Sequence, residues 1–190
     1  MIAATLALAR RGDRVAVADA DRQLSALGWL GRRPGSAAHI RGLDWSRSSA
    51  IGDHPGRLDW PVIDAPGALK GSKAEALIAE ATAVLAPVQP SVFDENATRG
   101  FLEEIDEVKR VRKGRVAVHL VANRLRTGSR AEQGPDGFFA RMERRPLARI
   151  AERAVYAELA VDGLSVFDRE LSSLEPIKQQ WQPIVSFLTA

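Results

Sequence analysis

The stretch that most constrains the fold is Arg14 to Leu30, where a short apolar run ends in two carboxylates and a helix pattern follows. The run Val15 to Ala18 contains no polar residue, which is typical of a strand buried on both faces of a parallel sheet. Asp19 and Asp21 end this run, and Ser25 begins the helix pattern. Open α/β sheets bind ligands at the carboxyl ends of their strands. The two acids are therefore candidates for a binding site, and the alternative is that they are turn and helix-capping residues.

A second apolar strand pattern also ends in an acid. Residues 60–67 read WPVIDAPG, so that Asp64 is followed by a turn-forming Pro-Gly pair. A carboxylate beside the first pair is what a site needs to hold Mg²⁺ through water and to orient an attacking water near a phosphate. Two more strand patterns, VLAPVQPS at 84–91 and LVANR at 120–124, complete the set of informative stretches.

Strand and helix patterns alternate along the chain, which predicts an α/β fold with a doubly wound, mainly parallel sheet. Besides the strands above, we expect strands over 38–43, 82–86, 115–122 and 147–150. Residues 127–135 read as a polar loop. The expected helices cover 2–11, 72–80, 91–112, 138–143, 156–161 and 174–188, the last broken at Pro176 and Pro183.

Length and composition narrow the function classes. The 190 residues suffice for a single domain, 1–190, and are too few for two of ordinary size. No run approaches the roughly 20 apolar residues that span a bilayer, and no secretory signal pattern is present, so we expect a cytoplasmic protein. The absence of cysteine excludes a disulfide framework, a thiolate zinc site and a cysteine nucleophile. The net charge of +3 mildly favours an acidic partner such as nucleic acid.

The four stretches, in this order, resemble the ParA/MinD family of deviant P-loop ATPases, and most closely the short bacterial ParA-type partition proteins. VADADRQLSALGWL resembles the family's VDxDPQxSxxxWL, and VIDAPG resembles VIDTPPG. APVQPSVFDENATRGFLEEI resembles VPVQPSPxDxxATxxxxxxI, and VANR resembles VxNR. The resemblance covers residues 2 to about 167. It implies a three-layer, P-loop NTPase-like fold and a partition or positioning ATPase that switches on ATP binding and hydrolysis.

The resemblance also implies roles for individual residues. Asp21 matches the acid that positions the attacking water, and Asp19 matches the acid near Mg²⁺. Asp64 matches the Walker B acid, which holds Mg²⁺ through water, and Gly67 would place a backbone N–H near the γ-phosphate.

The last of the four motifs implies contacts with the nucleotide base. Asn123 matches the residue that reads the adenine, and Arg124 flanks the base. ATP and Mg²⁺ are therefore the implied cofactors.

One family element has no counterpart in these residues. Residues 2–11 resemble a family helix that follows a first strand and a phosphate loop of the form KGGxGKT. This sequence contains no Gly-Lys dipeptide and therefore no such loop. We therefore expect a fold without that strand and loop, two unpaired strand edges, and ATP binding that is weak or absent. The look-alike KGSK at 70–73 is predicted to be a solvated loop that opens a helix.

Two basic clusters suggest partners. The basic residues within 109–115 close a predicted helix, and the favourable interaction of cations with a helix C-terminus explains part of this cluster. ParA-type proteins bind DNA without sequence preference through basic residues toward the C-terminal part of the fold, and the alternative is a solvated charged surface. The resemblance also implies a homodimer and a ParB-like or cargo-adaptor partner, without a membrane anchor. The DNA-binding candidates are Arg141, Arg144, Arg145, Arg149 and Arg153.

Two other functions remain as alternatives. The first is a degenerate, non-hydrolysing family member that acts as a DNA- or partner-binding module. The second is a domain related to cobyrinic acid a,c-diamide synthase, which ranks last because that enzyme needs a glutaminase domain with a nucleophilic cysteine and this sequence has no cysteine.

Overall fold

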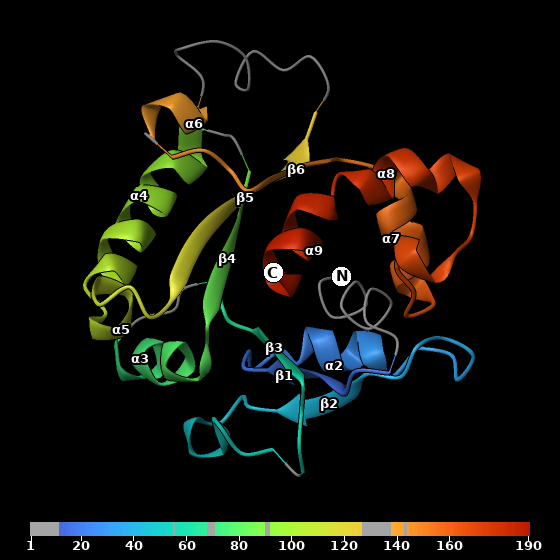
Figure 1. Cartoon of the computed structure of the whole chain (residues 1–190), viewed down its shortest axis with the longest axis horizontal. Helices are drawn as coiled ribbons and strands as arrows, with labels where there is room; N and C mark the ends of the chain where they lie inside the picture. Colours follow the sequence, from blue (N-terminus) through green and yellow to red (C-terminus); the bar gives the residue numbers. More distant parts are fainter. Residues whose placement is uncertain (1–11, 55, 68–70, 90–91, 127–137, 143) are drawn as a thin grey trace. The chain divides into compact units, whose positions relative to one another are not determined.

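The computed structural model describes residues 12–54, 56–67, 71–89, 92–126, 138–142 and 144–190 (Figure 1). The helix expected over 2–11 and the loop expected over 127–135 lie outside the described residues. The chain divides into two compact units, Met1–Glu80 with Ala154–Glu175, and Ala81–Arg153 with Pro176–Ala190. None of the described helices combines the length and the apolar character needed to cross a membrane.

The first unit is built on a parallel three-stranded sheet in the order β2-β1-β3. Its strands are β1 (Val15–Asp19), β2 (Arg41–Asp44) and β3 (Trp60–Asp64). The register aligns the last residues of all three strands, because Asp19 pairs with Asp44 on one side and with Asp64 on the other. The predicted strand ends therefore meet at one edge of the sheet.

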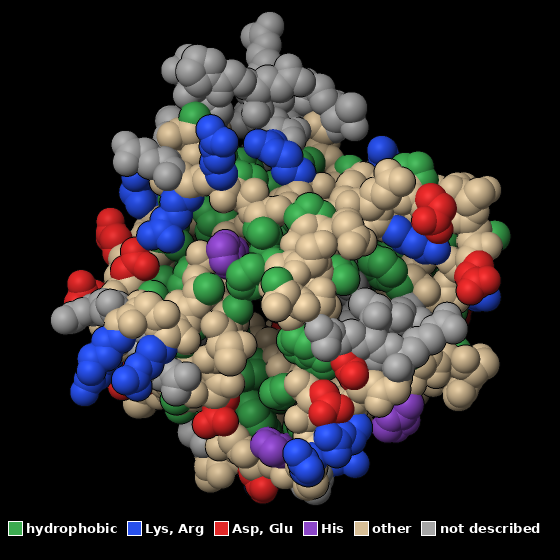
Figure 2. All heavy atoms as spheres, viewed as in Figure 1, with side chains coloured by type: hydrophobic (Ala, Val, Ile, Leu, Met, Phe, Trp, Pro, Cys, Tyr) green, Lys and Arg blue, Asp and Glu red, His purple; other side chains and the backbone are tan. Residues whose placement is uncertain are grey.

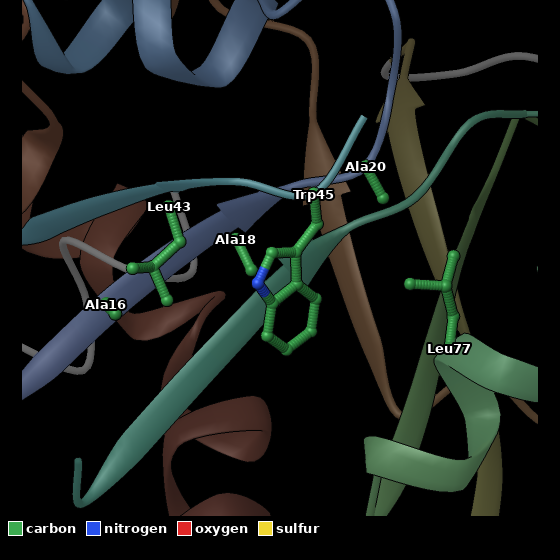
Figure 3. Packing of buried hydrophobic residues seen from close by; sticks show 6 residues of the cluster. All are labelled: Ala16, Ala18, Ala20, Leu43, Trp45 and Leu77. Atoms are coloured by element: carbon green, nitrogen blue, oxygen red, sulfur yellow. The ribbon is translucent and has the colours of Figure 1, made fainter. Parts of the chain in front are cut away.

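Side chains cover the central strand β1 on both faces, and all five of its residues are buried. On one face, small alanines leave room for the ring of Trp45 and for Leu77 of α3 (Gly71–Glu80), as Figure 3 shows. On the other face lies α2 (Ser25–Leu30), which approaches so closely that a Cβ at Gly42 would lie 2.7 Å from the Leu27 side chain. Helices on both faces of the sheet confirm the predicted layered α/β architecture. The alanines are Ala16, Ala18 and Ala20.

Within the first unit, a buried ion pair fastens the later segment Ala154–Glu175 to the segment before residue 81. The Arg33 guanidinium lies 2.6 Å from the Asp168 carboxylate, with side chains only 5% and 3% exposed. Arg33 also donates to the Gly163 carbonyl, at 3.0 Å. Gly163 has φ +65°, and a Cβ there would overlap the backbone nitrogen of Arg33, so only glycine fits this close approach. The segment contains α7 (Ala154–Val161) and the short 3₁₀ helices η2 (Val166–Asp168) and η3 (Ser172–Leu174).

The second unit has its own parallel sheet, in the order β4-β5-β6. His119 of β5 contacts Phe187 of α9 edge-on, with ring centroids 4.5 Å apart, which places α9 against one face of this sheet. The strands are β4 (Ala83–Val88), β5 (Ala117–Leu125) and β6 (Ala148–Ala151). The helices are α4 (Val92–Asp106), α5 (Lys109–Arg112), α6 (Phe138–Arg141), α8 (Glu175–Gln179) and α9 (Gln182–Thr189).

The structure differs from the predicted elements in two helical regions. The single helix predicted over 91–112 is wrong, because Val108 takes an extended conformation (φ −65°, ψ 124°) and separates α4 from α5. The last helical region is divided near the two prolines, as predicted, and Pro176 and Pro183 lie in the first turns of α8 and α9 rather than at helix ends. Proline fits there because a first-turn N–H has no acceptor within the helix.

The structure has two three-stranded sheets where the sequence predicted one. β3 is an edge strand of the first sheet, and β4 is an edge strand of the second. The Asp64 carbonyl accepts from the Ala20 N–H, so alternate residues of β3 face β1 and Pro61 faces the outer edge. Thr82 bonds to Ala117 in the same way, which turns Pro87 of β4 outward. Because proline lacks an N–H, each outer edge offers one fewer donor to another strand.

The buried ion pair leads to a stability prediction. Arg33→Ala leaves the Asp168 carboxylate buried without its partner, and we expect the free energy of unfolding to fall by about 3–5 kcal/mol. Arg14→Ala is the matched control, because Arg14 and Asp59 form an exposed pair, and its effect should be much smaller. Urea denaturation of both variants checks this, and equal losses would contradict the assignment of Arg33 as the fastening residue.

Candidate functional site: an acidic strand edge

Asp19 organises the carboxyl edge of the first sheet. Its carboxylate is fully buried and accepts three backbone N–H groups: from Asp21 on Oδ1 at 3.1 Å, and from Ala26 and Leu27 on Oδ2 at 2.9 and 3.1 Å. The residue before α2, Leu24, supplies no side-chain cap, so Asp19 caps the helix from the end of β1. The capping alternative from the sequence is thus confirmed for Asp19, and its predicted place near Mg²⁺ stays a prediction.

Asp21 lies in a tight turn between β1 and α2. Its Oδ1 accepts the N–H of Gln23 at 2.9 Å, and its backbone carbonyl accepts the N–H of Leu24 at 3.2 Å. Leu24 has a left-handed backbone (φ 51°), a conformation that costs a non-glycine residue roughly 1–2 kcal/mol. Strain of this kind collects at functional turns, where the surrounding bonds enforce it.

Asp64 ends β3 beside these two acids. Partial desolvation, together with the negative charges of Asp19 and Asp21, raises the pKa of Asp64 above its ordinary value. The three carboxylates therefore converge, as the strand-end pattern predicts. The sequence pattern missed a fourth acid, Asp44, at the end of β2; a hydrogen bond from Ser46 lowers the pKa of Asp44. Asp44 follows only a short, weakly apolar run, which is why the strand pattern did not single it out.

The acids at this edge differ in how far their oxygens are already bonded. Within the described ranges, no group of three His, Cys, Asp or Glu side chains is arranged to hold a metal ion by itself. The Asp19 oxygens already accept three N–H groups, whereas the Asp21 carboxylate accepts one, from Gln23. Desolvation and, after it, repulsion by Asp19 and Asp21 raise the pKa of Asp64, and a bound cation would relieve the repulsive part.

Lys73 adds a positive charge at the same edge. Its Nζ donates to the Ala20 carbonyl at 2.6 Å and to the Ser46 carbonyl at 3.3 Å. The prediction that 70–73 opens a helix is confirmed by α3, which begins at Gly71, and the prediction of solvation is wrong for Lys73, whose side chain is half-buried and bonded. No feature of the sequence marks these contacts, because they join residues 27 and 53 positions apart.

The other residues predicted to contact the nucleotide are Gly67, Asn123 and Arg124, and none of them is buried. Gly67 is exposed, and a Cβ there would meet no atom within 4 Å, so packing does not require glycine. In the second unit, Asn123 is half-buried and Arg124 is exposed, at a register shift in the β5–β6 ladder. Arg124 has φ 53°, and among the described non-glycine residues it shares a positive φ with Leu24 alone. Backbone strain thus falls in two of the predicted motifs.

The basic candidates in the second unit differ in their contacts. Arg144 forms an ion pair with Asp106 of α4 at 2.8 Å, and Arg149 lies over the ring of Phe139 at 5.7 Å. Arg145 and Arg153 are exposed, whereas the side chain of Arg141 lies outside the described residues. Figure 2 shows basic side chains around α4 interleaved with acidic ones rather than gathered in one patch.

A hollow of about 590 Å³ lies at the opposite, amino end of the first sheet. Its lining includes Arg14, His39, Arg41 and Arg57, and none of the four acids. Arg14 is already paired with Asp59. Ligands of open α/β sheets bind at the carboxyl ends, so the acidic edge is the stronger candidate.

No family model and no curated protein matches the sequence. Solved structures do match. MinD from Pyrococcus horikoshii, complexed with Mg-ADP, superposes with a TM-score of 0.61 at 17% identity, covering 98% of this chain and 89% of that one. MinD in the MinC:MinD cell division complex of Aquifex aeolicus gives 0.67 at 18%, covering 98% and 87%.

A putative plasmid partition protein from Borrelia burgdorferi B31, bound to AMPPNP, gives a TM-score of 0.65 at 12% identity, covering 99% of this chain and 90% of that one. Identities this low show a shared fold. The chain therefore has the P-loop NTPase-like α/β fold of these proteins, as the sequence motifs predict.

The raised pKa of Asp64 sets a stability prediction with a definite sign. Ionising a carboxyl whose folded pKa lies above its unfolded pKa costs the folded state free energy, so stability falls as pH rises through that interval. Asp64→Asn should therefore be more stable than the wild type at neutral pH and equally stable in acid. Urea denaturation at both pH values tests this, with Asp162→Asn, at an exposed position, as control. A neutral-pH loss of stability in Asp64→Asn would contradict the acid repulsion.

Proposed function

We propose that the chain is a ParA/MinD-type protein that positions DNA or another cargo by binding and hydrolysing a Mg-nucleotide at the acidic edge. The observation that carries the proposal is the convergence of Asp19, Asp21 and Asp64 at the carboxyl ends of adjacent parallel strands. Three supports agree: the ordered family motifs, the shared fold, and acids placed where open α/β sheets bind ligands.

Each acid has a distinct task in this proposal. Asp64 would hold Mg²⁺ through water, and Asp21 would orient the water that attacks the terminal phosphate. Asp19 fixes the turn that presents Asp21 by accepting its N–H. Mg²⁺ supplies the positive charge that offsets phosphate and carboxylate repulsion. The motif resemblance alone assigns Asn123 and Arg124 to the adenine and the Gly67 N–H to the phosphate, and these three roles stay predictions.

We expect these 190 residues by themselves to bind nucleotide weakly or not at all, and therefore to be inactive as an ATPase. The matched motifs supply acids, an amide and a backbone N–H, and most triphosphate affinity in P-loop proteins comes from the loop amides and lysine. The alternative function is a non-hydrolysing module that keeps the fold and binds DNA or a partner protein.

Mg-ATP titration followed by amide NMR shifts detects even weak binding. We expect millimolar ATP to shift the amides of 20–24 and of Asp64, Ala65 and Gly67 in the wild type only when Mg²⁺ is present. Asp64→Asn should lose this response because it removes the charge that holds Mg²⁺, and the control Asp162→Asn should keep it. Unshifted amides in the wild type, or an intact response in Asp64→Asn, would refute the proposed site.

DNA is the cargo that the family resemblance suggests. Arg145 and Arg153 are exposed, so their charges are accessible to DNA phosphates, and acidic side chains lie among the basic ones around α4. MinD of Aquifex aeolicus is in complex with MinC, which supports a protein partner as well. A homodimer and a ParB-like or cargo-adaptor partner belong to the same proposal.

We expect DNA binding to be independent of sequence and steeply dependent on salt. Replacing Arg144, Arg145 and Arg149 with Ala should weaken it and reduce the salt slope by about 0.9 for each phosphate that is no longer neutralised. Fluorescence anisotropy with a random duplex at several salt concentrations measures both effects, with Arg22→Ala, an exposed residue of the first unit, as control. Failure of the wild type to bind at low salt would remove DNA from the proposal.

A further inference from the structure

We propose that Lys73 is a positioning residue of the acidic edge, because its ammonium holds the turn that presents Asp21. This role belongs to the chain without ligand, and its consequence for Mg-nucleotide binding rests on the proposed function. The sequence motifs assign no role to this lysine.

The geometry of the contacts carries the first step. The Lys73 Nζ lies 2.6 Å from the Ala20 carbonyl oxygen and 3.3 Å from that of Ser46. Hydrogen bonds from an ionised donor are about twice as strong as neutral ones. Lys73 thus joins the chain just beyond β1 to the chain just beyond β2.

The position of Ala20 makes this bond consequential. Ala20 lies between Asp19 and Asp21, is fully buried, and donates its own N–H to the Asp64 carbonyl at 2.8 Å. Its peptide groups are therefore fixed on one side by β3 and on the other by Lys73. A shift of Ala20 would move the neighbouring Asp21, whose N–H is bonded to the Asp19 carboxylate.

The place of Lys73 on its helix argues against an incidental contact. Lys73 lies in the first turn of α3, where the helix dipole disfavours a cation. The two carbonyl oxygens offset this cost by accepting from the ammonium. Because α3 follows Asp64 in the chain, Lys73 links the segment after one acid to the turn that carries the other.

Amide hydrogen exchange of the ligand-free protein tests the inference directly. Lys73→Met keeps most of the aliphatic stem and removes the donors, so exchange of the Asp21 and Gln23 amides should accelerate by about tenfold or more, as expected for the loss of charge-assisted bonds. Val17, buried in β1, should be unaffected because the sheet stays folded. Lys73→Arg should restore part of the protection. Lys113→Met, at an exposed lysine of the second unit, is the matched control.

Two results would overturn the inference: unchanged exchange of Asp21 and Gln23 in Lys73→Met, or equal acceleration of Val17, which would show general destabilisation. A Mg-ATP titration of the same variants separates this inference from the proposed function. Lys73→Met should weaken the response of the Asp21 amide, and Lys73→Arg should keep more of it. If the wild type itself gives no response, the proposed function fails, whereas the exchange result still decides the role of Lys73.

Discussion

The first unit depends on one buried carboxylate. Asp19 has no exposed surface, and three backbone N–H groups satisfy its two oxygens. Burying a carboxylate is costly unless its oxygens are bonded, so this arrangement holds only while β1, the turn and α2 keep their relative positions. The same hydrogen bonds to Asp19 also hold Leu24 in its left-handed backbone conformation and set the orientation of Asp21. The interaction that caps α2 therefore also holds the candidate site in place.

The acidic edge contains repulsive interactions between carboxylates, which make the folded state less stable. Asp64 lies near two other carboxylates, and their charges together with desolvation raise its pKa. Burial of apolar surface elsewhere in the unit, such as the packing of Trp45 against the alanines of β1, offsets this local cost. Proteins commonly retain such local costs at sites that a ligand stabilises.

The sequence predicted those parts of the molecule that local pattern determines. The strand ending at Asp19, the helix beginning at Ser25 and the strand ending at Asp64 follow from apolar runs and their polar ends, and they are confirmed. Asp44 was missed because its strand is short, and the Lys73 contacts because they join distant positions. The break at Val108 was missed because apolar spacing continues through it, while the helical backbone does not. Hydrogen bonds between distant residues and local backbone angles do not change the apolar periodicity of the sequence, so they cannot be predicted from it.

The pKa of the Asp64 side chain tests the central claim most directly. Carboxyl ¹³C chemical shifts measured over a pH titration, with and without Mg²⁺, follow this one group in the intact chain. We expect a pKa above that of an ordinary aspartate, lowered by Mg²⁺ and lowered in Asp21→Asn, because a cation or the loss of a neighbouring charge relieves the same repulsion. An ordinary pKa that neither Mg²⁺ nor Asp21→Asn changes would contradict a cation-binding acidic edge.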